Sequence, residues 1–300
     1  TARKFWAVSG PKTDFAGFME ESAAATGLVA QQVPAETIKE ILKEQGDQMQ
    51  AMMNTLRQQA AKAIDEEDEF PTQEAKETMK SAIDDFLSAA EATMMTGKTD
   101  VGGVIQMAPD SFTAVFGGYF VQTDKLESGL KKVVSLADKD PEFPGVKWNA
   151  ENYAGLNFHT IQIPIPDDEE EARQMFGDAL NLAVGLGPET VIVAIGKDNM
   201  AAAKKVLDNS KSQAGKEVKP MTMSISLASI MKVAAAFADE EEAPQVKMMS
   251  DILDSQSGNL DHIRILAEMI PNGAKYRVEI EEGVLKAIAA GAMSAQQAGF

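Results

Sequence analysis

Along this chain, the spacing between apolar residues changes repeatedly from two residues to three or four residues. An alternation with a period of two is typical of a strand, and a spacing near 3.6 is typical of a helix. Four segments show this change across a turn that ends in Asp or Glu, so we expect each to be a strand followed by a helix with an acidic N-terminal cap. They are residues 4–19, 118–133, 191–206 and 276–288, and the expected caps are Asp14, Asp124, Asp198 and Glu281 or Glu282.

Between the first two of these segments lies a long stretch in which the apolar residues have only the spacing of a helix. Apolar residues recur every three or four positions over residues 34–64 and again after Thr72, on either side of an acidic break at residues 65–72. Two amphipathic helices that are joined by a short turn bury their stripes best against each other. We therefore predict an autonomous antiparallel helical hairpin over residues 34–94, packed through Met52, Met53, Leu56, Met79, Ile83 and Phe86.

From residue 100 onward, segments of strand period come in pairs that are separated by short turns. Successive strands joined by tight turns run antiparallel, and the sequence Asn272-Gly273 is typical of a hairpin turn. The pattern predicts an α+β fold in which antiparallel β-hairpins alternate with helices packed on the sheet faces. The expected pairs are residues 101–107 with 113–122, 146–149 with 156–164, 180–184 with 190–195 and 260–269 with 274–281.

These patterns divide the chain into four regions. Residues 1–33 form the first strand-and-helix unit, which packs with the rest, and residues 34–96 form the inserted helical hairpin. Residues 97–214 form a domain of hairpins and helices, and residues 215–300 form a second α+β part that ends in a C-terminal helix. The last division falls in a segment rich in Ser, Lys and Gly at residues 210–220, which is typical of a linker.

The composition argues against several classes of protein. The 300 residues include 46 Asp and Glu but only 28 Lys and Arg, and the resulting net charge of −18 opposes binding to nucleic acid. The absence of cysteine excludes disulfides, thiolate metal sites and cysteine nucleophiles. No apolar run approaches the roughly 18 residues of a membrane-spanning helix, so we expect no membrane insertion.

Motifs for nucleotides and for calcium are incomplete. Gly97-Lys98-Thr99 resembles the end of a phosphate loop, but the first glycine of that loop would fall at Ala92, within a helix. Residues 138–142 alternate oxygen-bearing side chains as a calcium loop does, but Phe143 replaces the required glycine and Asn149 replaces the bidentate glutamate. We therefore expect no cofactor.

The remaining candidates for chemistry are histidines and acidic runs. His159 and His262 are the two histidines of the chain, and nothing in their spacing brings them together with carboxylates around a metal. We expect each at a partly exposed strand position. Acidic runs at residues 65–69, 167–171 and 239–242 fall at helix boundaries, where they cap helices and solubilise the chain. The prediction is therefore no catalytic, cofactor-binding or metal-binding residue.

Three segments resemble known sequences. They read GYFVQTDKLESGLKKVVSLADKD from Gly118, YAGLNFHTIQIPIPDDEEEARQMFGDALNLAVGLGPETVIVAIGKDNMAAAKKVLDNS from Tyr153 and MIPNGAKYRVEIEEGVLKAI from Met269. Over residues 100–300 the chain resembles uncharacterised exported proteins of planctomycete bacteria. The resemblance implies an exported, periplasmic protein and assigns no catalytic residue. The chain begins at Thr1 directly before a predicted strand, and we interpret this as an N-terminal segment that was cut off or left out, either a removed export signal or a shortened chain.

These observations favour a protein that does not catalyse a reaction. We expect a non-enzymatic exported protein with a binding or structural role, because the repeated units are scaffold elements without a catalytic grouping. An alternative is a carrier of an apolar, lipid-like ligand in a groove between helices and sheet, lined by some of the 17 Met and 13 Phe residues. An enzyme that uses scattered carboxylates is the third alternative. We also expect a homo-oligomer, formed through a strand edge at residues 4–8 or through the helical hairpin.

Overall fold

The computed structural model describes residues 11–67, 70, 72–239, 243–255, 260–270 and 273–297. Twelve strands lie in this part of the chain. Two short ones, β1 (Lys12–Thr13) and β9 (Lys216–Glu217), pair with each other. The others are β2 (Ala25–Gln32), β3 (Lys98–Ala108), β4 (Ser111–Tyr119), β5 (Lys147–Tyr153), β6 (Leu156–Pro164), β7 (Ala179–Leu186), β8 (Thr190–Gly196), β10 (Met221–Ser226), β11 (His262–Ile270) and β12 (Gly273–Ile280).

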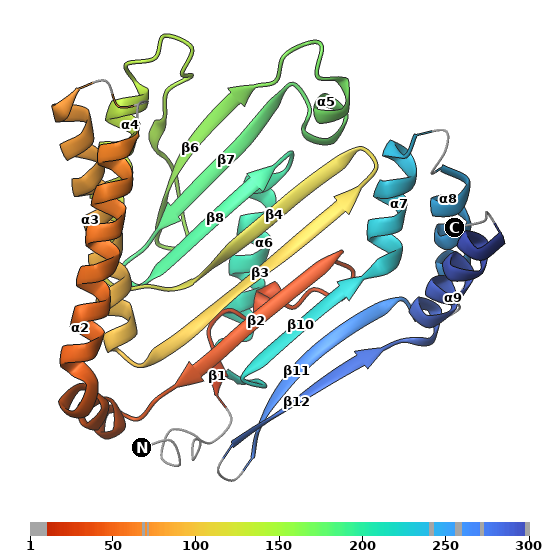
Figure 1. Cartoon of the computed structure of the whole chain (residues 1–300), viewed down its shortest axis with the longest axis horizontal. Helices are drawn as coiled ribbons and strands as arrows, with labels where there is room; N and C mark the ends of the chain where they lie inside the picture. The colour runs from red at the N-terminus through yellow and green to blue at the C-terminus, as the bar shows by residue number, and fades with distance from the viewer. Residues whose placement is uncertain are drawn as a thin grey trace.

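These ten strands form one antiparallel sheet (Figure 1), in the order β12-β11-β10-β2-β3-β4-β8-β7-β6-β5. Each predicted pair is a hairpin of neighbouring strands: β3 with β4, β5 with β6, β7 with β8 and β11 with β12. The predicted α+β class and antiparallel pairing are therefore confirmed. Two turn residues, Pro271 and Asn272, and the predicted strand edge at residues 4–8 lie outside the described part of the chain.

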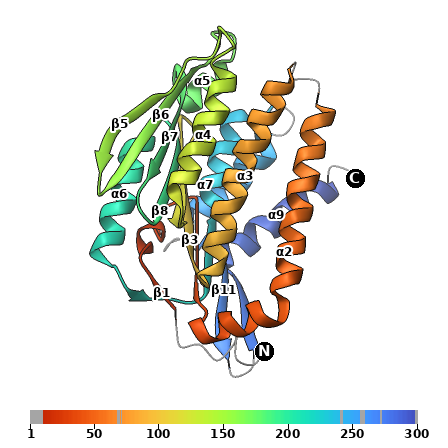
Figure 2. The same cartoon turned by 90° about the vertical axis from the view of Figure 1, so that its left-hand side faces the viewer.

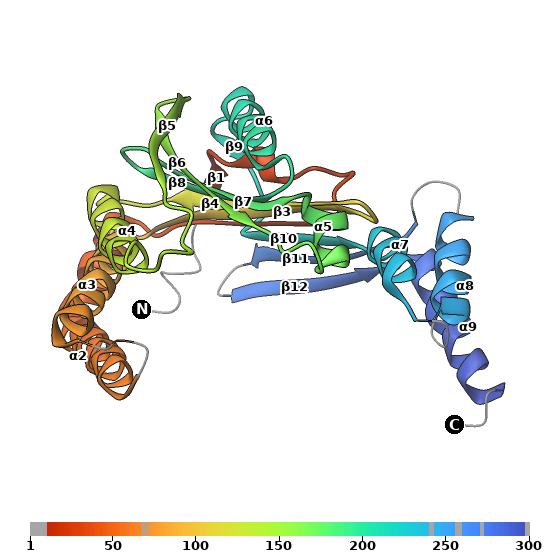
Figure 3. The same cartoon turned by 90° about the horizontal axis from the view of Figure 1, so that it is seen from above.

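The helices cover the two faces of the sheet unequally. α6 (Asn199–Ser212) and the 3-10 helix η1 (Ala16–Phe18) lie on one side, which we call the core face, and two groups of helices flank the other side, the open face, at its opposite ends (Figure 3). A short helix, α5 (Glu170–Phe176), follows β6. One group consists of α2 (Ala35–Glu66), α3 (Gln73–Met95) and α4 (Thr123–Ala137), side by side (Figure 2), and the other of α7 (Leu227–Phe237), α8 (Ala243–Asp254) and α9 (Glu282–Gln297).

The main hydrophobic core lies between the core face and α6. Leu28, Phe158 and Ile192 point to this side from three different strands, and each is at most 1% exposed. Phe18 of η1 and Val206 of α6 pack in the same cluster. Because successive side chains of a strand alternate between its faces, the residues next to these strand residues point to the open face.

The sheet runs without a break across the predicted divisions of the chain. β2, from the first predicted region, pairs with β3 on one side and with β10 on the other. These neighbours come from the third and fourth predicted regions, so three of the four regions contribute strands to a single sheet. The segment at residues 210–220, which we expected to be a linker, contains the end of α6 and the strand β9.

The first predicted unit differs from the expectation. Instead of a full helix after Asp14, the chain forms only η1 and then β2, a strand that the sequence analysis did not predict. Gly17 lies directly against α6: its N–H donates to Ser210 Oγ at 3.0 Å, and a Cβ on Gly17 would lie 2.1 Å from the Val206 carbonyl oxygen. This close approach leaves no room for a side chain at Gly17 and favours a single tight turn.

The acidic residues of the other three units lie at helix starts. Asp124 is the second residue of α4, Asp198 immediately precedes α6, and Glu282 is the first residue of α9. Asp198 is the N-cap of α6 but makes no capping hydrogen bond, and the N-cap of α4 is Gln122 instead of the expected Asp124. These carboxylates therefore act through their charge, which the positive N-terminal end of the helix dipole attracts.

The helical hairpin is present, and Thr72 caps its second helix by accepting a hydrogen bond from the Ala75 N–H at 3.1 Å. The hairpin is not autonomous, because α3 packs against α4 as well as against α2. Met53 is buried, whereas Met52 and Leu56 are 52% and 42% exposed, so the predicted packing stripe is wrong at these two positions. In the described part of the chain, no helix combines the length and the apolar character needed to cross a bilayer.

We expect Phe158→Ala to lower the free energy of unfolding by about 3–5 kcal/mol, the usual loss when a large aromatic side chain is removed from a core. The matched control is Phe116→Ala on the open face of the same sheet, because the Phe116 ring is 43% exposed and should contribute clearly less. Urea unfolding followed by circular dichroism measures both losses. Equal losses would contradict the position of the core on the α6 side.

Candidate functional site

An apolar cleft of about 310 Å³ lies on the open face, between α4 and the strands β5, β6 and β7. This volume is at the lower end of the usual range of ligand sites, about 300–1,000 Å³. One imidazole, that of His159, interrupts a wall that is otherwise almost entirely apolar. The apolar lining comprises Leu130, Val133, Val134 and Ala137 of α4, Phe143 and Val146 of the following loop, Trp148 of β5, and Ile161, Leu182 and Val184 of the sheet.

The position of α4 over the strands depends on α3. α4 packs more extensively against α3 than against any strand of the sheet. The two helices are in tight contact at Gly129, where a Cβ would lie 2.5 Å from the Phe86 ring, and Lys132 Nζ donates to Asp85 Oδ2 of α3 at 2.6 Å. The opposite stripe of α4, at positions 130, 133, 134 and 137, faces the strands and forms the roof of the cleft.

His159 is the buried polar side chain of the cleft, with 4% of its surface exposed. It follows Phe158 on β6, so the alternation along the strand turns His159 to the open face while Phe158 enters the core. Its Nδ1 accepts a hydrogen bond from the Asn149 N–H at 3.0 Å. Its Nε2 is buried and has no hydrogen-bond partner among the described residues.

The hydrogen bond at Nδ1 determines where the His159 proton lies. Because Nδ1 accepts, the neutral ring carries its proton on Nε2, which is therefore a buried donor. Burial lowers the pKa of His159 below its usual value of 6.5, while Glu127 opposes this shift and Lys131 adds to it. The ring is thus neutral at neutral pH. A buried donor that is left unmatched costs about 1–3 kcal/mol, so the cleft favours any molecule that supplies an acceptor.

A β-bulge positions the surroundings of this donor. The register between β5 and β6 shifts between Lys147 and Glu151. Within the shift, Asn149 adopts a φ of 50°, a left-handed conformation that Asn tolerates better than most residues. Trp148 contacts the His159 ring edge to face, with the ring centroids 4.9 Å apart. Bulges often re-aim side chains beside functional sites, and this one directs both an N–H and an aromatic ring at His159.

Charged residues of α4 lie beside the apolar lining. Lys131 Nζ and Glu127 Oε1, one helical turn apart, form an ion pair at 2.6 Å. Lys131 Nζ also lies 5.6 Å from the centroid of the Trp148 ring, close enough for a cation–π interaction. The long Lys131 side chain thus links α4 to β5 across one side of the cleft.

This arrangement suits an apolar molecule that carries one hydrogen-bond acceptor. At about 30 Å³ per heavy atom, the share of a water molecule in the liquid, the 310 Å³ of the cleft correspond to a molecule of about ten heavy atoms. Its alkyl or aromatic part would leave water for contact with aliphatic side chains and Trp148. A carbonyl or ether oxygen would accept the hydrogen bond from His159 Nε2.

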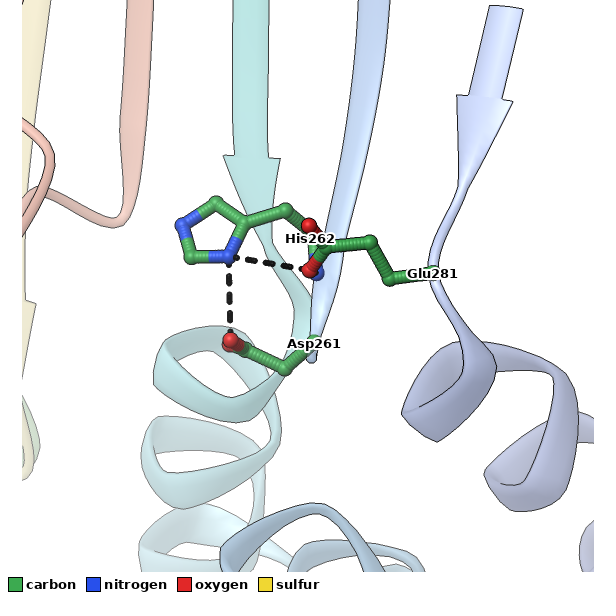
Figure 4. A group of neighbouring side chains, drawn as sticks. All are labelled: Asp261, His262 and Glu281. Atoms are coloured by element: carbon green, nitrogen blue, oxygen red, sulfur yellow. Dashed lines mark hydrogen bonds and ion pairs between the residues drawn. The ribbon is translucent and has the colours of Figure 1, made fainter. Parts of the chain in front are cut away.

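A second polar group, Asp261, His262 and Glu281, lies at the other end of the sheet (Figure 4). His262 Nδ1 is 3.0 Å from Asp261 Oδ1 and 3.6 Å from Glu281 Oε2, and the three atoms lie within 4.8 Å of one another. A tetrahedral Zn²⁺ with bonds of about 2.0–2.2 Å holds its ligand atoms about 3.3–3.6 Å apart. By distance, therefore, these described residues are able to hold a metal ion.

Donors of the protein itself already occupy these carboxylates. Asp261 Oδ2 accepts hydrogen bonds from Ser226 Oγ at 2.5 Å and from a backbone N–H of α7 at 3.3 Å. Glu281 Oε2 accepts a hydrogen bond from the His262 N–H at 2.8 Å, and its Oε1 pairs with Arg264. The group joins the ends of β11 and β12 to the start of α7, and we assign it a structural role.

The environment of Glu281 stabilises its ionised form. Burial alone would raise the pKa of Glu281, but hydrogen bonds from Arg264 and from the His262 N–H outweigh this effect and lower the pKa below its usual value of 4.5. The folded protein therefore binds this proton less tightly than the unfolded chain does. The resulting stabilisation is complete above pH 4.5 and is lost as the pH falls through the lower, folded-state pKa.

A third feature is a shallow apolar hollow at the centre of the open face. One rung of the sheet places Met223, Gly27, Gly103 and Phe116 on four adjacent strands. The two glycines leave a hollow of about 300 Å³ between the side chains of Met223 and Phe116. It is more open to solvent than the cleft below α4, so it would bury a smaller part of a ligand.

The structure keeps the two histidines apart. They lie on β6 and β11, with six strands between them, so they do not share a site. His159 is 4% exposed and His262 is 7% exposed, and the prediction of partly exposed positions is therefore wrong. The sequence could not indicate which helix or side chain would cover each of these strand positions.

Two residues that depart from the calcium-loop pattern contribute to the cleft. Phe143 and Asn149, which break the calcium-loop pattern, respectively line the cleft and donate to His159. Gly97-Lys98-Thr99 forms the turn after α3 and the first residues of β3, so a strand follows the motif where a phosphate loop needs a helix. The sequence analysis missed Trp148 and the donor role of Asn149, because no pattern distinguishes a bulge from a regular strand at these positions.

Comparisons with known proteins add no assignment. The chain matches no protein-family model, no curated protein and no solved structure. The function proposed below therefore rests on the cleft and its chemistry.

We expect Glu281→Gln to lower the free energy of unfolding by about 1.5–3 kcal/mol at neutral pH, the range for a hydrogen bond to a charged group. The loss should shrink as the pH falls below 4.5 and through the lower, folded-state pKa, because the wild-type carboxylate then becomes protonated as well. Urea unfolding at neutral pH and at a series of acidic pH values measures the difference. Glu282→Gln is the control, since this exposed neighbour makes a helix-end charge interaction and a surface ion pair with Lys286, whose loss should cost clearly less. A loss that is independent of pH would contradict the role of the Glu281 charge.

Proposed function

We propose that this protein is a non-enzymatic binding protein that carries an apolar ligand with one hydrogen-bond acceptor in the cleft below α4. The observation that supports this most directly is the Nε2–H of His159, which is buried in an apolar wall and has no partner among the described residues. The great majority of buried polar side-chain atoms in folded proteins are hydrogen-bonded. A ligand oxygen would satisfy this donor while the apolar part of the ligand fills the cleft.

The ligand that we propose is uncharged. His159 is held neutral by burial, so a carboxylate bound to it would lose its hydration without gaining a positive charge in return. A ketone, ester or ether loses much less hydration and still accepts the hydrogen bond. This chemistry favours a carrier over a purely structural role, because a scaffold has no use for an unmatched donor in a preformed cleft.

The place of action is also part of the proposal. The resemblance of residues 100–300 to exported planctomycete proteins supports a role outside the cytoplasm. A carrier of uncharged apolar molecules would be useful there, since such molecules partition poorly into water.

A matched pair of probes tests the hydrogen bond. Butyrophenone and butylbenzene share a phenyl ring and a four-carbon chain, and differ only where a carbonyl replaces a methylene next to the ring. We expect His159→Phe, which keeps an aromatic ring but removes the donor, to weaken butyrophenone binding about threefold to tenfold, as for one neutral hydrogen bond. Butylbenzene binding should not weaken. Isothermal titration calorimetry of both probes on both proteins completes the thermodynamic cycle.

A second pair of variants tests whether the probes bind in the cleft. Ala137→Phe would fill the space below α4 and should abolish the binding of both probes. Ser135→Phe places the same ring on the exposed side of α4 and serves as the matched control. The proposal fails if the wild-type protein binds neither probe, or if His159→Phe affects the two probes equally.

A further inference from the structure

The strand β12 forms one free edge of the ten-stranded sheet. Within the described residues it pairs with β11 alone. Three apolar side chains of this edge strand are strongly exposed: Tyr276 at 65%, Val278 at 60% and Ile280 at 46%. Proteins usually protect such an edge, because its unpaired N–H and C=O groups are ready to pair with another strand.

The direction of the free backbone groups follows from one hydrogen bond. The Glu281 N–H donates to the His262 carbonyl at 3.1 Å, and the register continues with Ile280 opposite Ile263. In an antiparallel pair, alternate residues point their N–H and C=O groups toward the same neighbour. The odd-numbered residues of β12 therefore face β11, and the even-numbered residues Tyr276, Val278 and Ile280 face outward.

We propose that β12 pairs with β12 of a second copy of this chain, antiparallel and with Val278 on the two-fold axis. Val278 then lies opposite the partner's Val278, and Tyr276 lies opposite the partner's Ile280. Each of these pairs exchanges both backbone hydrogen bonds, because all of these residues have outward-facing N–H and C=O groups. Their apolar side chains meet on the open face, in a self-complementary contact of the kind that two-fold symmetry requires.

The charges on the other face of β12 select this register. Lys275, Arg277 and Glu279 alternate with the apolar residues, and within one chain Arg277 Nε lies 2.8 Å from Glu279 Oε1. With Val278 on the axis, Arg277 lies opposite the partner's Glu279 on both sides of the axis. Moving the axis by one residue places two Arg277 or two Glu279 side chains opposite each other, which is unfavourable. The edge is therefore complementary to itself in one register.

The pairing is independent of the proposed ligand site. The cleft below α4 involves β5, β6 and β7, at the opposite edge of the sheet from β12. Pairing would join two sheets into one continuous sheet and place their open faces side by side. A carrier that fails to bind butyrophenone could still form this dimer, and a monomeric protein could still bind the probe.

Charge-exchange variants test the pairing. The wild-type chain should show twice the 32.2 kDa of one copy in sedimentation experiments at micromolar concentration. These experiments use physiological salt, which screens the net charge of −18 on each copy. Arg277→Glu and Glu279→Arg should each give monomers, because each creates like-charge pairs across the axis. The double variant should restore the dimer. An equimolar mixture of the two single variants should form a heterodimer, since all of its facing charges are opposite.

Val278→Pro provides a second, uncharged test. The Val278 N–H points away from β11, so proline at this edge position removes one intermolecular donor from each copy, two hydrogen bonds in the dimer, and none of the β11–β12 ladder. We expect a folded monomer with an unchanged circular dichroism spectrum. The proposal is overturned by a monomeric wild-type chain, by a dimer that all of these variants retain, or by single variants that do not recombine on mixing.

Discussion

The rest of the structure depends on the unequal covering of the two faces of one sheet. On the core face, α6 and η1 pack directly on the strands and bury large side chains such as Phe18 and Phe158. On the open face, helices flank the sheet at its two ends and leave its centre accessible (Figure 3). The alternation of side chains along each strand places every second residue on the open face. Any polar group that the open face contains must therefore find its partner in an incompletely packed layer.

His159 is the polar group that the unequal covering of the two faces leaves without a second hydrogen-bond partner among the described residues. The same strand that inserts Phe158 into the core inserts His159 below α4, and the bulge at Asn149 supplies a donor to only one of its two ring nitrogens. α4 cannot close on the strands there, because Gly129 and Lys132 hold it against α3. The cleft is thus a consequence of helix–helix packing. Its polarity comes from the His159 ring alone, and the backbone N–H of Asn149 on the neighbouring strand determines which ring nitrogen carries the proton.

The sequence predicted the elements better than it predicted their arrangement. The four hairpins, the helical hairpin and the cap at Thr72 follow from local periods and turns, which require no knowledge of distant contacts. β2 was missed because apolar and polar residues do not alternate clearly along it. Thr26, Leu28 and Ala30 face the core, and Gly27 is one of the residues between them. The division into regions was not informative about the sheet, since strand pairing joins segments far apart in the chain. The cleft was unpredictable for the same reason: Trp148, His159 and α4 meet only through tertiary packing.

The glycine pair at the centre of the sheet determines the depth of the open face there. Gly27 and Gly103 face each other on β2 and β3, and Gly102, beside Gly103, points to the opposite face, where the Phe18 ring leaves no room for a Cβ. The rungs on either side, Ala25 with Ile105 and Val29 with Val101, carry apolar side chains on the open face and line the same hollow. The missing side chains are therefore confined to one rung, and the hollow is a local depression in an otherwise continuous apolar surface.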